Sequence, residues 1–93
     1  MNLNLNYEGF EKFLVSIRPN PIHGGKMYRF IFNDKWGASV VKHADSYGHE
    51  RDLWELAVLY RGELCYSTDI TSDVIGWLTD EEVRNILKRI MEL

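Results

Sequence analysis

The segment from residue 26 to residue 68 limits the possible folds most, because it predicts β-strands that carry apolar residues on both of their faces. Runs of β-branched, aromatic and aliphatic residues predict three strands at 26–32, 37–43 and 53–60 and a shorter fourth at 63–67. A sheet with two apolar faces must cover both of them, and an uncovered apolar patch usually marks an interaction site. We therefore expect the face that the protein's own helices leave open to meet a partner.

Two short polar segments predict the turns between these strands. Arg61-Gly62 is typical of a two-residue hairpin, because glycine readily adopts the positive φ that such turns need. Asn33-Asp34-Lys35 predicts the turn between the first two strands. A two-residue turn at Arg61-Gly62 would place Cys65 opposite Val58, where we expect a buried and unreactive thiol.

Two helices are predicted, one before the strands and one after them. Asn6 is a suitable N-cap for a helix over 7–17, whose apolar stripe would be Tyr7, Phe10, Phe13, Leu14 and Ile17. The sequence Thr79-Asp80-Glu81-Glu82 matches the capping box that begins a second helix. The apolar stripe of this second helix would be Val83, Ile86, Leu87, Ile90 and Met91.

The predicted fold is a two-layer α+β domain, in which an antiparallel three- or four-stranded meander is flanked by an N-terminal and a C-terminal helix. The single domain, 1–93, divides into a helix with a Pro/Gly linker at 1–25, the sheet at 26–68 and a helical C-terminus at 69–93. Short connections favour both helices on one face of the sheet. One helix on each face is the alternative, and it would remove the argument for a partner.

Composition and charge narrow the class of protein. A chain of 93 residues with 45% hydrophobic and 27% charged residues is typical of one globular domain. A single cysteine fits a reducing compartment, and the N-terminal residues lack the pattern of a signal peptide, so we expect a cytoplasmic protein with no membrane association. The net charge of −3, with scattered basic residues, argues against a nucleic-acid partner.

The polar stretch at 43–52 contains the residues that most resemble metal ligands. Imidazole and carboxylate groups could bind zinc or another divalent ion here, and the candidates are His43, Asp45, His49 and Asp52. Their spacing matches no established ligand pattern, and loops between strands are commonly rich in such residues. No nucleophile is placed beside a base in a recognisable pattern. We therefore predict no metal, no cofactor and no enzymatic activity.

Aromatic residues are numerous for so small a chain, and Trp and Tyr are enriched in binding hot spots. We expect Trp54 and Trp77 to lie in the core. Trp36 ends the first turn, and Tyr47 lies in the polar loop, so both are placed to contact a partner. The predicted partner-binding residues are Trp36, Tyr47, His49 and Arg51.

Four stretches of the chain, at 36–43, 46–48, 53–59 and 69–79, carry a resemblance. Their sequences are WGASVVKH, SYG, LWELAVL and DITSDVIGWLT. Together they resemble a family of small, functionally uncharacterised proteins encoded by tailed bacteriophages. The resemblance covers roughly residues 27–93 and implies a phage origin and a setting in the cytoplasm of an infected bacterium. It carries no catalytic residues over to this chain.

The leading functional hypothesis is a non-enzymatic phage accessory protein that binds a host protein or complex and modulates it. Inhibition of a bacterial defence system, such as a CRISPR effector, is one specific form of this hypothesis. The first alternative is a metal- or small-molecule-binding domain that uses the 43–52 loop. The second alternative is self-association, in which the open sheet face pairs with its own copy as a homodimer.

Overall fold

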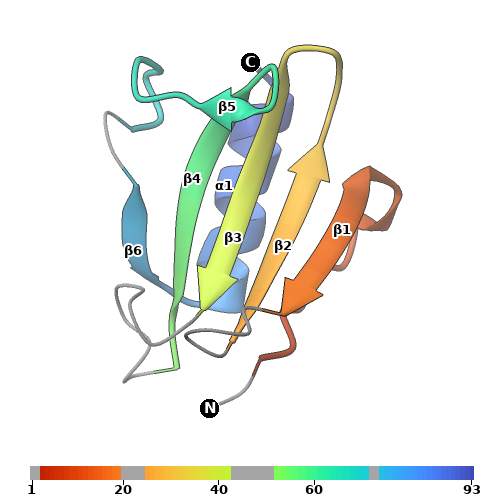
Figure 1. Cartoon of the computed structure of the whole chain (residues 1–93). Coiled ribbons are helices and arrows are strands. Elements are labelled where there is room, and N and C mark those ends of the chain that lie inside the picture. The colour runs from red at the N-terminus through yellow and green to blue at the C-terminus, as the bar shows by residue number, and fades with distance from the viewer. Residues whose placement is uncertain (1–2, 20–24, 43–51, 72–73) are drawn as a thin grey trace.

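The computed structural model describes residues 3–19, 25–42, 52–71 and 74–93 of the chain. Within these ranges an antiparallel sheet of six strands carries one α-helix across one of its faces (Figure 1). The elements in chain order are a 3-10 turn η1 (Glu11–Phe13), β1 (Leu14–Pro19), β2 (Lys26–Ile31), β3 (Trp36–Lys42), β4 (Trp54–Tyr60), β5 (Glu63–Leu64), β6 (Ile75–Leu78) and α1 (Asp80–Met91).

The sheet is a meander in the order β1-β2-β3-β4-β5, and β6 also pairs with β4. β5 and β6 occupy opposite ends of the same edge of β4, because Leu64 pairs with Leu59 and Leu78 pairs with Trp54. All of these pairs are antiparallel. β1 forms the other edge of the sheet, so the long central strands β2, β3 and β4 are paired on both sides.

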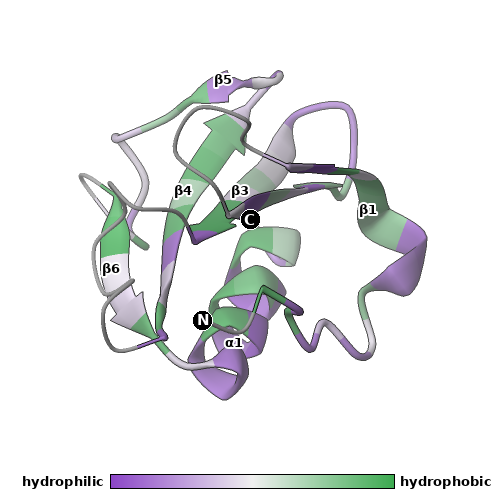
Figure 2. Ribbon diagram, turned by 60° about the horizontal axis from the view of Figure 1, so that its bottom comes forward, coloured by the Kyte–Doolittle hydropathy of each residue, from purple (hydrophilic) through white to green (hydrophobic). Residues whose placement is uncertain are grey.

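The predicted hairpin at Arg61-Gly62 is confirmed. Both residues have positive φ, 52° and 85°, which is the backbone of a type I′ turn. β5 lies on the side of the sheet away from α1 (Figure 2). The Cys65 N–H donates to the Val58 carbonyl at 2.9 Å, so the predicted neighbour of Cys65 is also confirmed, although β5 ends one residue earlier.

The predicted C-terminal helix begins at its capping box. The Glu82 N–H donates to Thr79 Oγ1 at 3.2 Å, and the Thr79 N–H donates to Glu82 Oε1 at 3.0 Å. Of the predicted apolar stripe, Val83, Leu87 and Ile90 are fully buried against the sheet. The hydrophobic side of α1 faces the strands, and its hydrophilic side faces away (Figure 2).

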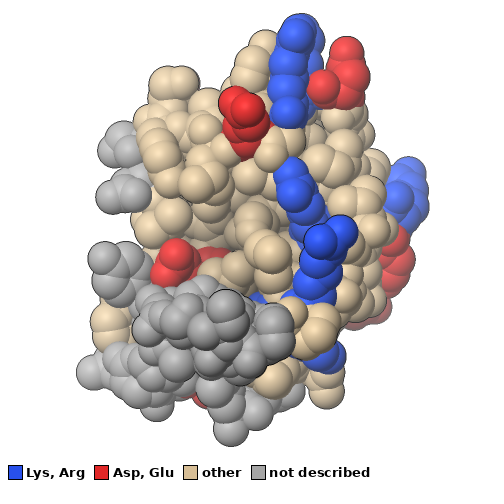
Figure 3. Space-filling view, in the orientation of Figure 1, with Lys and Arg blue, Asp and Glu red and all other residues tan. Residues whose placement is uncertain are grey.

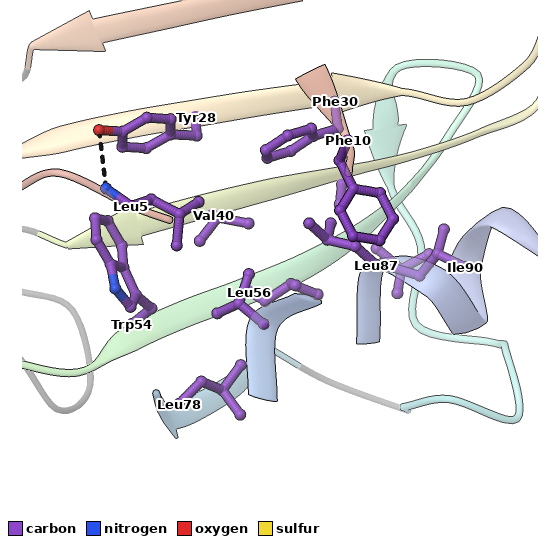
Figure 4. Close-up of a cluster of buried hydrophobic side chains, with 13 residues drawn as sticks. Leu5, Phe10, Tyr28, Phe30, Val40, Trp54, Leu56, Leu78, Leu87 and Ile90 are labelled. Atoms are coloured by element: carbon purple, nitrogen blue, oxygen red, sulfur yellow. Dashed lines mark hydrogen bonds between the residues drawn. The ribbon is translucent and has the colours of Figure 1, made fainter. Parts of the chain in front are cut away.

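The core lies between α1 and the face of the sheet that α1 covers, which we call the covered face (Figure 4). Side chains that alternate along β2, β3 and β4 meet in rows across this face, as the strand register requires. These rows are Phe30, Ala38 and Val58, and next to them Tyr28, Val40 and Leu56. All six are buried, so the stability of the fold comes mainly from this layer.

The predicted helix over 7–17 is wrong. Residues 14–19 form β1, and residues 3–13 form an extended and turning segment whose only helical part is η1. Gly9, with φ 94°, interrupts any helix here, and the alternating run around Val15 pairs with β2 as a strand. The expected fold with flanking helices at both ends and three or four strands is corrected to six strands and one C-terminal helix.

The N-terminal segment still fills the place expected of a helix, on the covered face. Phe10 is buried, and its ring lies 6.4 Å from that of Phe32 at a steep angle. Tyr28 Oη holds the start of the segment, because it donates to the Leu3 carbonyl at 2.7 Å and accepts from the Leu5 N–H at 3.2 Å (Figure 4). Across the described ranges, no helix has the length and apolar run that crossing a bilayer requires.

Candidate partner-binding surface

The face of the sheet opposite α1, here called the open face, is the surface towards the viewer in Figure 1. None of the described helices covers it. The register assigns its residues, since they alternate with those of the covered face. They are Val15, Ser16 and Arg18 of β1; Met27, Arg29 and Ile31 of β2; Gly37, Ser39 and Val41 of β3; Glu55, Ala57 and Leu59 of β4; and Leu64 of β5.

Three apolar side chains of the open face are strongly exposed. Val15 and Leu64 each expose 57% of their surface, and Met27 exposes 37%. Val15 is the extra residue of a β-bulge in β1, since Leu14 pairs with Phe30 but Ser16 already pairs with the preceding residue of β2. The bulge turns Val15 onto the open face, where it helps to line a hollow.

Two adjoining hollows cross the open face. One, of about 220 Å³, lies between the middle of the sheet and the β4–β5 hairpin, and its lining is Met27, Arg29, Ser39, Leu59, Gly62 and Leu64. The other, of about 310 Å³, lies over β1 and β2, and its lining is Val15, Ser16, Arg18, Met27 and Arg29. Met27 and Arg29 line both hollows, so the two adjoin at these side chains, and we call them together the depression of the open face.

Arg29 lies where the two hollows meet. Its Nη2 donates to the Gly62 carbonyl at 2.7 Å, so the side chain extends from β2 towards the β4–β5 turn. The residue is half-buried among Met27, Leu59 and Leu64. In the part of the chain that the structure describes, the Arg29 guanidinium forms no ion pair with a carboxylate. The open face therefore contains a partly desolvated cation with unused hydrogen-bond donors.

The positive charge of this face contrasts with the net charge of −3 of the whole chain. Lys and Arg side chains follow one another from the top to the lower right of the open face (Figure 3). Arg18 is exposed, and its neighbour across the strands is Met27. Acidic groups on or beside this surface are Glu55, which lies in the same cross-strand row as Arg18, Glu63, which lies between Gly62 and Leu64 in the β4–β5 hairpin, and Asp34, in the hollow at the β2–β3 turn.

The residues predicted to bind a partner do not gather on the open face. Trp36 is half-buried and packs against the ring of Tyr60, with centroids 5.0 Å apart, on the same side of the sheet as Ala38. The other three predicted contacts, Tyr47, His49 and Arg51, lie outside the described residues. The candidate surface that the sequence did not indicate consists of aliphatic and arginine side chains on alternate strand positions.

Of the four candidate metal ligands, the structure describes only Asp52. Its Oδ1 accepts a hydrogen bond at 3.0 Å from Lys42 Nζ, which also donates to the Asp52 carbonyl at 2.9 Å. The other candidates, His43, Asp45 and His49, lie outside the described residues. Among the residues that are described, no group of His, Cys, Asp and Glu could hold a metal ion.

Among the residues that the structure describes, Lys42 is the one buried charged residue, and it lies on the covered face. Its ammonium lies 4.1 Å from the centroid of the Trp54 ring, so a cation–π contact and the bonds to Asp52 together replace its lost hydration. The Trp54 indole N–H donates to Asp80 Oδ1 at 2.7 Å. This cluster ties β3, β4 and the start of α1 together and has a structural explanation.

Two expectations about buried residues are wrong in part. Trp54 lies in the core as predicted, but Trp77 exposes 47% of its surface and has a positive φ of 64°. Cys65 is only half-buried, and its sulfur lies 3.6 Å from Ser67 Oγ. Neither residue lines the depression on the open face.

No protein-family model, curated protein or solved structure matches this chain. The exposed apolar side chains and the arginines of the open face are therefore the features that bear on function.

Proposed function

We propose that this chain is a non-enzymatic binding module whose open sheet face docks onto a partner protein. The observation that carries the proposal is the set of exposed apolar side chains, Val15, Met27 and Leu64, which line the two adjoining hollows of the depression. Exposed apolar area of this kind, rimmed by polar groups, is typical of interaction surfaces. Within the described residues, no element of the chain's own covers these three side chains.

The resemblance to small tailed-bacteriophage proteins favours a specific form of this proposal. A phage accessory protein would act in the cytoplasm of an infected bacterium, where it would bind a host protein or complex and alter its activity. Inhibition of a defence system, such as a CRISPR effector, is one such outcome. A sheet face that presents apolar side chains beside arginines fits a protein that acts by occupying a surface of its target.

The test compares two methionines that are equally exposed on different surfaces. Met27 lies on the open face and Met91 lies on α1, and each exposes 37% of its surface. Tagged chain is used to recover partners from bacterial lysate, and the same recovery is repeated with Met27→Asp and with Met91→Asp. We expect a stoichiometric complex that Met27→Asp abolishes and Met91→Asp preserves. A complex that both variants retain, or that both lose, would contradict the proposal.

Self-association through the same face is the second candidate, since its apolar residues would suit a second copy as well. A two-fold dimer brings the same patch of both copies together, so Arg18 and Arg29 of both copies would be enclosed in one interface. Like charges brought together in this way oppose association. Light scattering of the purified chain distinguishes the two candidates, because a dimer that Met27→Asp dissociates would favour self-association.

A further inference from the structure

We propose that the partner segment held by the open face is acidic, with apolar residues beside a carboxylate that Arg29 and Arg18 bind. This inference rests on the proposed function and names the chemistry of the partner. Arg29 is a half-buried cation next to aliphatic side chains, and such a cation is unfavourable unless an anion or water compensates its charge.

The guanidinium of Arg29 has donors to spare. Arginine carries five N–H groups in a planar fork, and the described structure uses Nη2 for the Gly62 carbonyl. That bond fixes the direction of the side chain across the open face, so less rotamer freedom is lost when a ligand binds. A carboxylate is the group that best matches such a fork, because two parallel hydrogen bonds form with one anion.

Arg18 provides a second positive charge for the same anion or its neighbour. Arg18 pairs with Met27, which is two residues from Arg29 along β2. Arg18 and Arg29 are therefore diagonal neighbours on one face, with their Cα atoms about 7–8 Å apart. Both arginines line the hollow over β1 and β2. Arg18 forms no ion pair within the ranges that the structure describes.

The apolar lining indicates what flanks the carboxylate in the partner. Leu64 and Leu59 border Arg29 on the hairpin side, and Val15 borders it on the side of β1. Aliphatic partner side chains fit both places, one on each side of the anion. The surface therefore suits a protein segment that alternates apolar and acidic residues.

A nucleic acid would present phosphates instead, and the open face suits it less. Binding to a phosphate backbone relies on many cations and little opposing charge. Two carboxylates oppose this here. Glu55 lies in the same cross-strand row as Arg18, and Asp34 lines the hollow at the β2–β3 turn. Two arginines among aliphatic side chains are sufficient for a carboxylate but form only a small part of a phosphate-binding surface.

The experiment selects short random peptides on the intact, immobilised chain. We expect enrichment of peptides in which Asp or Glu adjoins Leu, Ile, Val or Phe. A synthetic peptide of the selected sequence is then measured on the variants Arg18→Gln and Arg29→Gln, with Arg89→Gln on the exposed side of α1 as the control. Because a hydrogen bond to a charged group is worth about 1.5–3 kcal/mol, each open-face variant should weaken binding roughly tenfold or more.

Several outcomes would overturn the inference. Selection of neutral apolar peptides that depend on Met27 but not on the arginines would refute the acidic partner and leave the proposed function standing. Peptides that bind regardless of Met27 would refute both. A fluorescein-labelled oligothymidylate that outcompetes the peptide, and is lost with Arg29→Gln, would assign the site to nucleic acid.

The melting temperature of each variant separates binding from folding. Arg29→Gln also removes the bond to Gly62, so its loss of binding counts only if the chain remains folded. Arg18→Gln has no such bond to lose and provides the decisive case. If Arg18→Gln and Arg29→Gln are both folded and bind the selected peptide with unchanged affinity, the proposal is refuted.

Discussion

The two faces of the sheet are built from alternate residues of the same strands, and they differ in what their apolar side chains do. On the covered face, Phe30, Val40 and Leu56 are fully buried by α1 and the N-terminal segment. On the open face, Met27 and Leu64 remain exposed. The apolar residues of the covered face therefore stabilise the fold, whereas Val15, Met27 and Leu64 on the open face keep much of their surface in contact with solvent.

The open face is itself uneven. Leu59 belongs to it by register but is buried, because its partner in the β4–β5 hairpin is Leu64 and β5 lies over this side of the sheet. Arg29 reinforces the hairpin through the Gly62 carbonyl. The β4–β5 hairpin that borders the depression is therefore held in place by these contacts, and such pre-organisation reduces the entropic cost of binding.

Truncating one leucine on each face should give the largest difference in stability between the two faces. Leu56→Ala should lower the free energy of unfolding by about 3 kcal/mol, because it removes buried methyl groups and leaves a cavity. Leu64→Ala should change it by no more than about 0.5 kcal/mol, because that side chain is already exposed. Urea denaturation of both variants measures the difference. Equal losses would mean that the open face also supports the fold.

A comparison of two tryptophans gives the next largest effect. Trp54→Phe removes the indole N–H that donates to Asp80 and weakens the contact with Lys42, so we expect a loss of about 2 kcal/mol. Trp77→Phe should stay within about 0.5 kcal/mol, because nearly half of that side chain is exposed. Thermal and urea unfolding check both variants. A larger loss for Trp77→Phe would show that its surroundings are structural.

These tryptophans also show what the sequence could predict. The strands β2, β3 and β4 lie within one residue or so of their predicted ranges, because alternation and turn residues are local signals. Trp54 was expected in the core and lies there. Trp77 was also expected in the core, but its exposure depends on how β6 pairs with the end of β4, a contact between distant residues.

The N-terminal segment shows the opposite outcome, since a clear local signal gave the wrong structure. Apolar residues at helical spacing occur over 7–17, yet Phe10 and Phe13 reach the core from a turning segment. Gly9 and the β-branched Val15 weaken a helix, and pairing with β2 offers the chain a better alternative. Tertiary contacts decided the structure here, and they are not visible in the sequence.

The candidate surface was predictable only in outline. Apolar residues on both faces of the strands indicate an open face, but the predicted partner-binding residues, Trp36, Tyr47, His49 and Arg51, belong to a turn and to the polar loop. Arg18 and Arg29 gave no signal, because their common position depends on the register between β1 and β2, including the bulge at Val15. Neither the register nor the bulge can be read from a single sequence.

The capping box at the start of α1, the helix that packs on the covered face, makes a smaller contribution to the free energy of unfolding. Thr79→Ala removes the side-chain half of the capping box and should cost about 1 kcal/mol of unfolding free energy. Glu81→Ala is the control, since this exposed residue of the first turn takes no part in the box and should cost only a few tenths. Equal losses in urea denaturation would contradict a specific role of the cap.

The smallest effect is expected where the covered face contains a charge. Lys42→Met should change the unfolding free energy by less than about 1 kcal/mol, because a buried ion pair gains little over an apolar side chain of similar size. Methionine keeps contact with the Trp54 ring, and sulfur–aromatic contacts replace part of the cation–π attraction. The half-exposed carboxylate of Asp52 regains water when its partner is removed.

Adding Asp52→Asn to the Lys42→Met variant should cost less than Asp52→Asn alone costs in the natural sequence, since the two residues form one ion pair and their substitutions are therefore not additive. Asparagine tolerates the positive φ of 61° at this position, so the second change introduces little backbone strain. Urea denaturation of the single and double variants measures both steps. A loss well above 1 kcal/mol for Lys42→Met would mean that the covered face depends on its charge as well as on apolar packing, and the contrast between the two faces would then be one of degree.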